Sequence, residues 1–209
     1  MGGETSSTRR YELKKRAGEM AEMRQRITEA AVHLHGTIGP ARTTMSAVAK
    51  EAGVQRHTVY RYFPTEAELF GACSGHYFTA NPWPDIQPWR AISDPRQRLT
   101  VALDELYAYY EQTEPMFSNV LRDVELVAAI GPAMAPLQAF MGEATEILGT
   151  GWPACGRKRD VLRAALLFAI DFLTWRALAS NTGITRPEAV ALVSALVEAA
   201  ASPPGRVTP

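Results

Sequence analysis

Apolar residues recur along this chain at helical spacing, and almost no segment alternates apolar and polar positions as a half-buried strand would. Within residues 27–34 the apolar positions fall at i, i+3, i+4 and i+7, so they share one face of a helix. This helix is expected to begin in the charged stretch 9–26 and to stop near Gly36. The whole pattern predicts an all-α fold of about nine helices.

Three shorter helices are expected after the Gly-Pro turn that follows the first one. The first of them follows Thr44, whose hydroxyl can cap it, and Gly53 is placed to end it. The second spans about 56–63 and is stopped by a proline. The third opens with Thr-Glu-Ala-Glu from Thr65, which is a capping box. Four helices therefore fit in the first 80 residues.

A segment rich in proline and tryptophan, NPWPDIQPWRAISDP, occupies residues 81–95 and marks the expected domain boundary. Beyond it, helices are expected to start at prolines 95, 115, 132 and 187, because proline suits the first helical turn. The last two helices are predicted over 158–181 and 186–201. The resulting divisions are a basic N-terminal arm over 1–22, a first domain over 23–80, a second domain over 81–202 and a disordered tail over 203–209.

Charge is divided unevenly along the chain, although 22 Lys and Arg balance 22 Asp and Glu overall. Residues 1–64 carry 11 basic and 6 acidic residues, whereas residues 65–209 carry 11 and 16. A basic first segment is expected to meet a polyanion, with chance clustering as the alternative. The two cysteines form no disulfide framework. Because no apolar run fits a membrane span or a signal peptide, no membrane association is expected, and the predicted location is cytoplasmic.

The basic segment also contains the layout of a helix-turn-helix unit. A short helix, a turn containing Gly53 and a second short helix follow one another between residues 44 and 63. Small or apolar residues must hold the crossing of two such helices, and Ala49, Val54 and Val59 meet that requirement. This layout is of moderate specificity by itself, and it predicts a unit that binds double-stranded DNA.

The string TTMSAVAKEAGVQRHTVYRYFPTEAELF, residues 43–70, resembles the DNA-binding signature of the TetR family of bacterial transcriptional regulators. The Thr-Thr start, the Ala-Gly-Val turn, the Thr-x-Tyr-x-x-Phe helix and the capped fourth helix all occur at the family's spacing. The match covers residues 24–77, and residues 80–209 match only in length and helical layout. The resemblance implies a homodimer with a C-terminal ligand-binding and dimerisation domain, and usually repression that a small-molecule effector relieves.

The recognition helix is expected to present Gln55, Arg56 and His57 at its N-terminal end, where side chains reach base edges. We expect Arg56 to contact guanine, the commonest base contact of arginine, with a phosphate contact as the alternative. For His57, a contact with a base or phosphate stands beside a role as a surface turn residue. The resemblance assigns hydrogen bonds with the DNA phosphates to four hydroxyl-bearing residues: Thr44, Thr58, Tyr60 and Tyr62.

Two further positions bear on DNA binding. Met45 occupies a position that reaches a base in some members of the family, and packing is the alternative. Glu66 departs from the family's usual lysine, and its carboxylate suits the helix dipole but repels phosphate. Either the docking tilts, or Arg61, Lys50 and the basic N-terminal arm supply the missing charge. That arm either adds contacts with DNA or stays disordered.

A ligand pocket is expected among the helices of 95–181. Aromatic residues at helical spacing more often form core than pocket lining. Asp171 lies in an apolar stretch, so it either binds a ligand or bonds an internal Arg or Tyr, and we favour the internal partner. Hydrophobic lining favours a lipophilic or aromatic effector. The predicted lining residues are Tyr107, Tyr110, Phe117, Arg122, Phe168, Asp171, Phe172 and Trp175.

The last two helices are expected to form the homodimer interface, because their apolar surface exceeds what one face needs. Two recognition helices about 34–36 Å apart would then read a palindromic site. No cofactor, metal site or catalytic constellation is expected from the sequence. The competing interpretations are an enzyme or small-molecule-binding helical protein, and an architectural DNA-binding protein without an effector.

Overall fold

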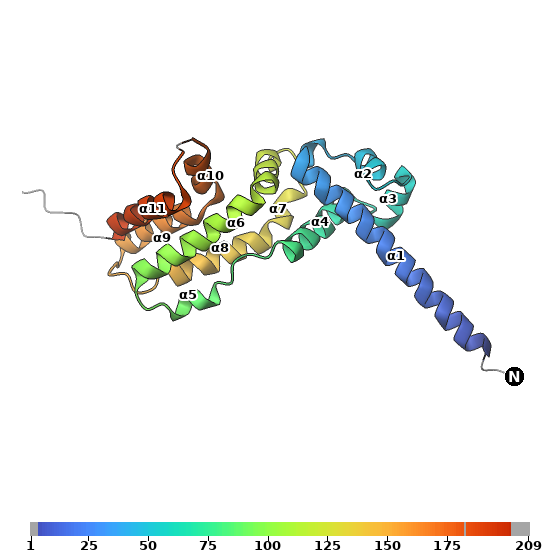
Figure 1. Cartoon of the computed structure of the whole chain (residues 1–209), viewed down its shortest axis with the longest axis horizontal. Helices are drawn as coiled ribbons and strands as arrows, with labels where there is room; N and C mark the ends of the chain where they lie inside the picture. Colours follow the sequence, from blue (N-terminus) through green and yellow to red (C-terminus); the bar gives the residue numbers. More distant parts are fainter. Residues whose placement is uncertain (1–3, 182, 202–209) are drawn as a thin grey trace, which may run out of the picture. The chain divides into compact units, whose positions relative to one another are not determined.

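The computed structural model describes residues 4–181 and 183–201, and every regular element in these ranges is a helix (Figure 1). The predicted all-α class is therefore confirmed. None of the described helices is long and apolar enough to cross a membrane. In chain order the elements are α1 (Glu4–Thr37), the 3-10 helix η1 (Pro40–Arg42), α2 (Met45–Glu51), α3 (Arg56–Tyr62), α4 (Glu66–Ala80), α5 (Gln87–Ala91), α6 (Pro95–Asp123), α7 (Ile130–Ala133), α8 (Ala135–Leu148), α9 (Arg157–Ile170), α10 (Phe172–Asn181) and α11 (Arg186–Ala201).

The chain forms two compact units, and it passes between them three times. The first unit comprises residues 1–81 and 115–133, and the second comprises 82–114 and 134–209. Helix α6 contributes to both, because its last part, from Pro115 onward, belongs to the first unit. The boundary expected at 81–95 therefore corresponds to the first of the three crossings.

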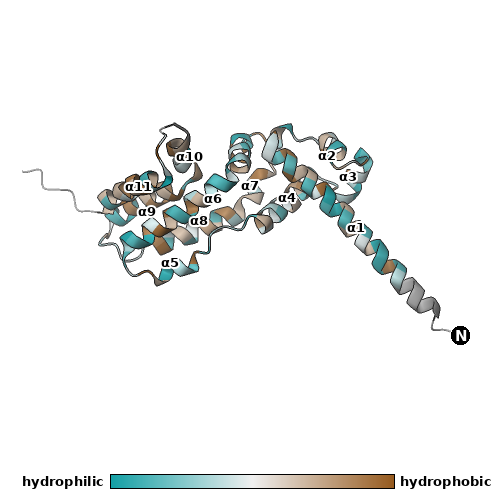
Figure 2. Ribbon diagram, in the orientation of Figure 1, coloured by the Kyte–Doolittle hydropathy of each residue, from teal (hydrophilic) through white to brown (hydrophobic). Residues whose placement is uncertain are grey.

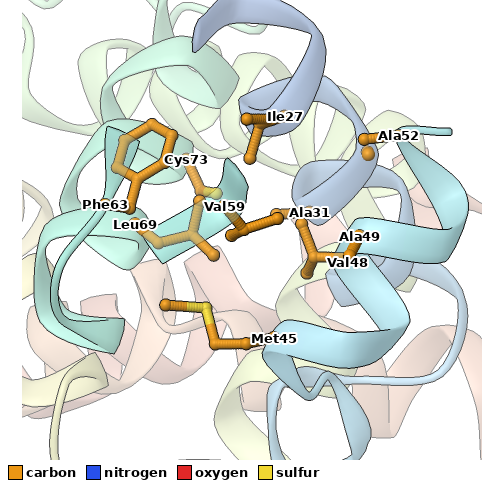
Figure 3. Packing of buried hydrophobic residues seen from close by; sticks show 11 residues of the cluster. Ile27, Ala31, Met45, Val48, Ala49, Ala52, Val59, Phe63, Leu69 and Cys73 are labelled. Atoms are coloured by element: carbon orange, nitrogen blue, oxygen red, sulfur yellow. The ribbon is translucent and has the colours of Figure 1, made fainter. Parts of the chain in front are cut away.

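The core of the first unit lies among α1, α2, α3 and α4. Ile27 of α1, Val48 of α2 and Val59 of α3 are completely buried there (Figure 3). Ile27 begins the apolar face predicted over 27–34. The N-terminal part of α1 has no such face, since residues 11–22 are all exposed and largely hydrophilic (Figure 2). The disordered alternative for the N-terminal arm is replaced by a helix from Glu4 onward.

Side-chain caps fix the helix-turn-helix as the sequence predicts. The Thr44 hydroxyl accepts a hydrogen bond from the Ala47 amide at 3.1 Å and so caps α2. Gly53 follows that helix with φ +64°, a conformation that glycine adopts without strain. At the start of α4, the Thr65 hydroxyl accepts from the Glu68 amide at 3.2 Å. These local bonds set where each short helix begins and ends.

The helix start predicted at Pro115 is wrong, because α6 continues through this proline from Pro95 to Asp123. Proline removes one backbone hydrogen bond of the helix interior. Buried residues on either side, Thr113 and Phe117, keep the helix packed across that position. The Thr113 hydroxyl also donates to the Tyr109 carbonyl at 2.7 Å. Burial on both sides thus outweighs the local signal.

The helix predicted over 158–181 is also wrong, because it is two helices that meet at Asp171. The backbone of Asp171 is extended, with ψ 137°. A further short helix, α5, forms inside the proline-rich connector. Helices α5, α7 and α10 were not expected, whereas the helix expected to start at Pro115 is part of α6, so the described ranges contain eleven α-helices instead of nine. The tail predicted over 203–209 lies outside the described residues.

The core of the second unit is formed by the first part of α6 together with α8, α9 and α11. Leu103, Leu148 and Leu166 are completely buried in it. Arg98, only 4% exposed, donates to the carbonyls of Ile92, Ile147 and Thr150 at 2.6 to 3.1 Å. A buried guanidinium therefore ties the start of α6 to the end of α8. The capping box predicted before α11 is present, since Glu188 accepts from the Thr185 amide at 2.7 Å.

Candidate DNA-binding interface and effector region

Helix α3 exposes most of the polar residues predicted to read DNA. Gln55 is its N-cap, and Arg56, His57, Tyr60 and Arg61 are exposed along it. The half-buried members of the predicted set are Thr58 and Tyr62, and the anchor on the inner side is the fully buried Val59. One face of α3 is thus fixed to the core while the other is open to a partner.

Arg56 and Tyr60 form a pair one helical turn apart. The Arg56 Nη2 donates to the Tyr60 hydroxyl at 3.1 Å, and the guanidinium carbon lies 5.4 Å from the centre of the tyrosine ring. A ring at this distance attracts a cation. Because the tyrosine oxygen accepts this bond, its own proton stays available for an external acceptor such as a phosphate.

Positive charge gathers beside α3 in a shallow hollow. Arg26 of α1, Lys50 of α2 and Arg61 of α3 line it together with Gln55 and Thr58. All three basic residues are exposed. Three cations close to one another attract a polyanion at long range. The hollow brings together two residues expected to offset Glu66, Arg61 and Lys50, and adds Arg26, which sequence reasoning did not single out.

Arg24 of α1 is a second contribution that sequence reasoning missed. Its Nη1 donates to the Tyr62 carbonyl at 2.8 Å, and its guanidinium carbon lies 4.1 Å from the centre of the Phe63 ring. These contacts attach the end of α3 to α1. The interaction joins residues 38 positions apart, so no local sequence signal could reveal it.

Met45 does not belong to the exposed face. Its side chain is 4% exposed and packs in the core of the first unit (Figure 3). The possibility that it contacts a base is therefore corrected in favour of packing. Thr44 beside it is exposed, and its hydroxyl, although it caps α2, keeps a proton to donate. Glu66 is exposed in the first turn of α4, where the helix dipole favours a carboxylate.

The residues predicted to line an effector pocket are divided between the two units. Phe117 and Arg122 belong to the first unit, whereas the other six belong to the second. Phe117 is buried. Arg122 is occupied by protein partners, as described below. Both residues therefore lie on the part of α6 that belongs to the first unit, and their expected role in an effector site stays a prediction.

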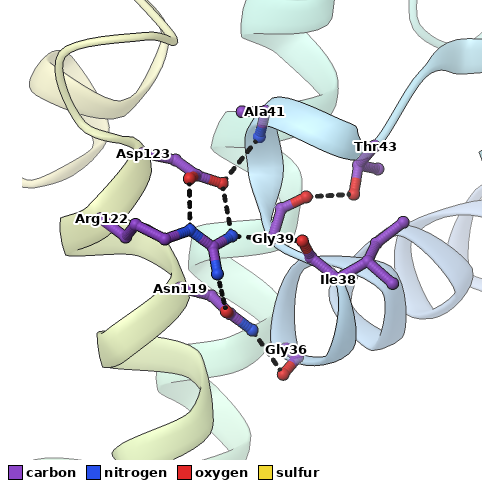
Figure 4. Close-up of polar contacts among 8 residues, drawn as sticks. All are labelled: Gly36, Ile38, Gly39, Ala41, Thr43, Asn119, Arg122 and Asp123. Carbon is purple, nitrogen blue, oxygen red and sulfur yellow. Dashed lines mark hydrogen bonds and ion pairs between the residues drawn. The ribbon is translucent and has the colours of Figure 1, made fainter.

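Arg122 joins α6 to the end of α1 (Figure 4). Its Nε donates to Asp123 at 2.8 Å, its Nη1 to Asn119 at 2.9 Å, and its Nη2 to the Ile38 carbonyl at 3.2 Å. Asn119 in turn donates to the Gly36 carbonyl at 2.8 Å. The network therefore holds the last turn of α6 against the turn that precedes η1.

Asp123 completes this network from inside. It is 2% exposed, and it accepts from the Ala41 amide at 2.9 Å. The Arg122 guanidinium and this amide hold the pKa of Asp123 below its usual range. Gly39, with φ +92°, lies so close that a Cβ there would collide with Arg122 and Asp123. Both the charge and the glycine are requirements of this junction.

Tyr107, Tyr110 and Asp171 build the break between α9 and α10. The hydroxyls of Tyr107 and Tyr110 donate to the carbonyls of Ala169 and Ile170 at 2.9 and 2.6 Å. Asp171 accepts from the Leu173 amide at 2.7 Å and so caps α10. Burial, and next the charge of Asp171, raises the pKa of both tyrosines. The internal partner of Asp171 is therefore a backbone amide, rather than an arginine or a tyrosine hydroxyl.

Phe172 and Trp175 pack with Tyr110 in an aromatic cluster and are almost completely buried. They are core residues rather than lining. Phe168, by contrast, is 55% exposed. With Asp171 it lines an apolar hollow of about 570 Å³ on α9, α10 and α11, whose other walls include Leu173, Leu192 and Leu196.

Comparison with known proteins gives a sequence-family match over part of the first unit and a fold match over most of the chain. Residues 27–73 match the sequence family described as bacterial regulatory proteins, tetR family. Nucleoid occlusion factor SlmA of Haemophilus influenzae (strain PittGG) is 39% identical over 56 residues, which is 26% of this chain and 26% of that protein. The match with this relative thus spans about a quarter of its length.

Two solved structures share the fold over most of the chain. A TetR-like transcriptional regulator from Rhodococcus sp. RHA1 covers 84% of this chain and 93% of its own, with a TM-score of 0.59 and 20% identity. A tetR-family transcriptional regulator from Streptomyces coelicolor covers 86% of this chain and 80% of its own, with a TM-score of 0.59 and 18% identity. At these identities the likeness concerns the fold.

Proposed function

We propose that this chain is a DNA-binding transcriptional regulator of the TetR family, which binds a palindromic operator as a homodimer and represses transcription until a small molecule releases it. The observation that carries the proposal is the anchored helix α3, whose outer face is open. Its N-terminal end presents Gln55, Arg56 and His57 beside a basic hollow. Such an end is what a recognition helix places in the major groove.

The residues of this face take different roles in the proposal. Arg56 reads a guanine, because its fork of donors matches the two acceptors of that base in the major groove. Gln55 and His57 flank it at the base edges. Hydroxyl groups and the basic hollow position the duplex by contacts with its phosphates. The phosphate-binding residues are Thr44, Thr58, Tyr60, Arg61 and Tyr62.

A second copy of the chain covers the apolar hollow on α9, α10 and α11. Phe168, Leu173 and Leu196 are each more than half exposed there. A contiguous apolar patch of this kind marks an interaction surface. A homodimer buries it against its own equivalent and gives the two recognition helices that a palindromic site requires. Leu192 and Leu167 extend the same face.

The second unit binds a lipophilic or aromatic effector in the cytoplasm. The bound effector changes DNA binding through the spacing of the two recognition helices. An effector that favours a different spacing lowers operator affinity without touching DNA. In the part of the chain that the structure describes, no three His, Cys, Asp or Glu side chains are grouped to hold a metal ion.

The test is selection of bound sequences from a random duplex library with the full chain. Arg56→Ala is expected to relax the preference at one position of each half-site, and Tyr60→Ala to weaken all sites alike. Arg159→Ala, an exposed arginine of the second unit, is the matched control and is expected to change neither. Recovery of no motif, with binding that depends on salt alone, would overturn the proposal of a sequence-specific regulator.

A further inference from the structure

A cavity of about 950 Å³ lies within the first unit, beside the helix-turn-helix. Its walls come from the end of α1, from η1, from the first turns of α2 and α4, and from residues 126–133. Most of the lining is apolar and includes Met45, Leu69, Phe70 and Val127. This volume is in the range of cavities that hold small molecules. It is separate from the residues predicted to line an effector pocket.

His35 is the polar side chain buried in this wall. It is 6% exposed, and its ring centre lies 5.0 Å from that of Phe70. Within the described residues, no group donates to or accepts from its ring nitrogens. By contrast, Thr43 donates to the Gly39 carbonyl, and Thr44 accepts from the Ala47 amide. Because its ring has no protein partner there, the imidazole of His35 can form a hydrogen bond with a ligand or with water that enters the cavity.

The protonation state of His35 defines what it can bind. Burial lowers its pKa to about 4, so the imidazole is neutral near pH 7. A neutral imidazole offers one N–H donor and one acceptor nitrogen. A ligand hydroxyl can bond to either nitrogen, whereas a ligand carbonyl can only accept from the N–H. Glu66 lines the same cavity, and its carboxylate disfavours an anionic ligand.

We propose that this cavity binds an uncharged, mostly apolar aromatic molecule whose single hydroxyl or carbonyl group forms a hydrogen bond with His35. The ring of the ligand packs against Phe70 and Leu69, and the charge of Glu66 excludes carboxylic acids. Thr44 and Met45 at the start of α2 line the same space. A ligand bound beside Thr44 is expected to change the affinity for DNA. This expectation rests on the proposed function, because it requires that Thr44 contacts a phosphate. Binding of the ligand itself does not depend on it.

Disulfide capture tests the site in the full chain. A thiol is introduced by Gly71→Cys, since Gly71 lines the cavity and an added Cβ meets no atom within 4 Å. Gly75→Cys is the matched control, four residues along α4, equally open but outside the cavity. Both carry Cys155→Ser, which removes the exposed native thiol. The probes are cystamine amides of 4-hydroxyphenylacetic, phenylacetic and 4-carboxyphenylacetic acid, and capture is measured by intact mass.

At position 71 we expect the hydroxyl probe to be captured on the order of fivefold more than the phenyl probe, the effect of one hydrogen bond, and the carboxylate probe least. At position 75 we expect equal capture of all three. Adding His35→Phe is expected to remove the preference for the hydroxyl, and His35→Gln to retain part of it. Equal capture at both positions, or a preference that survives His35→Phe, would overturn the site.

The link to DNA is measured separately, so that its failure is distinct from failure of the site. With the operator from the library selection, the captured hydroxyl probe is expected to change affinity in Gly71→Cys and not in Gly75→Cys. Unchanged affinity in both variants would contradict the regulatory role. The capture ratios require no DNA, and they would stand if no operator were found.

Discussion

Helix α3 and the break between α9 and α10 use polar side chains in opposite ways. On α3, Arg56 and Tyr60 face outward and bond only to each other among described residues. At the break, Tyr107 and Tyr110 face inward, and their hydroxyls satisfy backbone carbonyls. Side chains that are available for a partner and side chains that hold the fold can thus be of the same residue type. Their environment, rather than their identity, distinguishes the two.

Among the buried side chains that bond to backbone carbonyls, Arg98 is expected to have the largest effect on stability when it is replaced. Replacement by leucine leaves several buried carbonyls without a donor, and we expect a loss of about 4 kcal/mol in the free energy of unfolding. Urea denaturation followed by circular dichroism measures it. The control Arg159→Leu, at an exposed position, is expected to stay within about 0.5 kcal/mol of the native chain. Similar losses in both would show that Arg98 is not held by its carbonyls.

Gly39 and Gly53 separate conformational strain from crowding. Both have positive φ, but only at Gly39 would a Cβ collide with Arg122 and Asp123. We expect Gly39→Ala to lower the free energy of unfolding by about 3 kcal/mol and Gly53→Ala by about 1 kcal/mol. Thermal unfolding of the two variants side by side measures the difference. Equal shifts would mean that Arg122 and Asp123 move away from an added Cβ without loss of stability.

His35 makes the free energy of unfolding depend on pH, because burial lowers its pKa in the folded chain. Its pKa is about 4 in the folded chain and near 6.5 when unfolded, so the unfolded chain binds the proton first. The contribution of neutral His35 to the free energy of unfolding is therefore fully present above pH 6.5. It falls toward pH 4, by up to about 1.4 kcal/mol per pH unit.

Urea midpoints between pH 7.5 and 4.5 measure this slope. His35→Phe is expected to flatten it. His57→Gln, at an exposed position, is the control substitution. A slope that persists in His35→Phe would assign it to other groups, such as the carboxylate of Asp123, whose pKa is also lowered in the folded chain.

Two tyrosine-to-phenylalanine changes compare the regions directly. Tyr110→Phe leaves the Ile170 carbonyl without its donor, so we expect a loss of about 1 kcal/mol in the free energy of unfolding. Tyr60→Phe is expected to leave stability unchanged and to weaken operator binding by roughly fivefold, the effect of one phosphate hydrogen bond. Denaturation and duplex binding are measured for both variants. A weakened operator complex with unchanged stability in Tyr110→Phe would reverse the assignment.

The helix-turn-helix could be predicted from the sequence because its signals are local. Thr44, Gly53 and Thr65 each act within three or four residues of the helix ends that they define. The signals at Pro115 and Asp171 misled for the complementary reason. A proline fits both the first turn of a helix and, where packing holds on either side, its interior. An aspartate in an apolar helix gives no sign that it caps a second one.

The roles of Tyr107 and Arg122 in the fold depend on long-range contacts. Tyr107 bonds to a carbonyl 62 residues away, and Arg122 to one 84 residues away. No spacing in the sequence reveals such partners. The sequence analysis also did not single out His35. That its ring has no hydrogen-bond partner among the described residues emerged only from the contacts around it.

Helix α6 also constrains how this chain can diverge. Tyr107 and Tyr110 lie on the part of α6 that serves the second unit, and Asn119 and Arg122 on the part that serves the first. One inserted or deleted residue between these pairs would rotate them relative to each other by about 100°. The number of residues between the two pairs thus sets the angle between them about the axis of α6. Length changes are therefore expected in the turn after Asp123 sooner than within this helix.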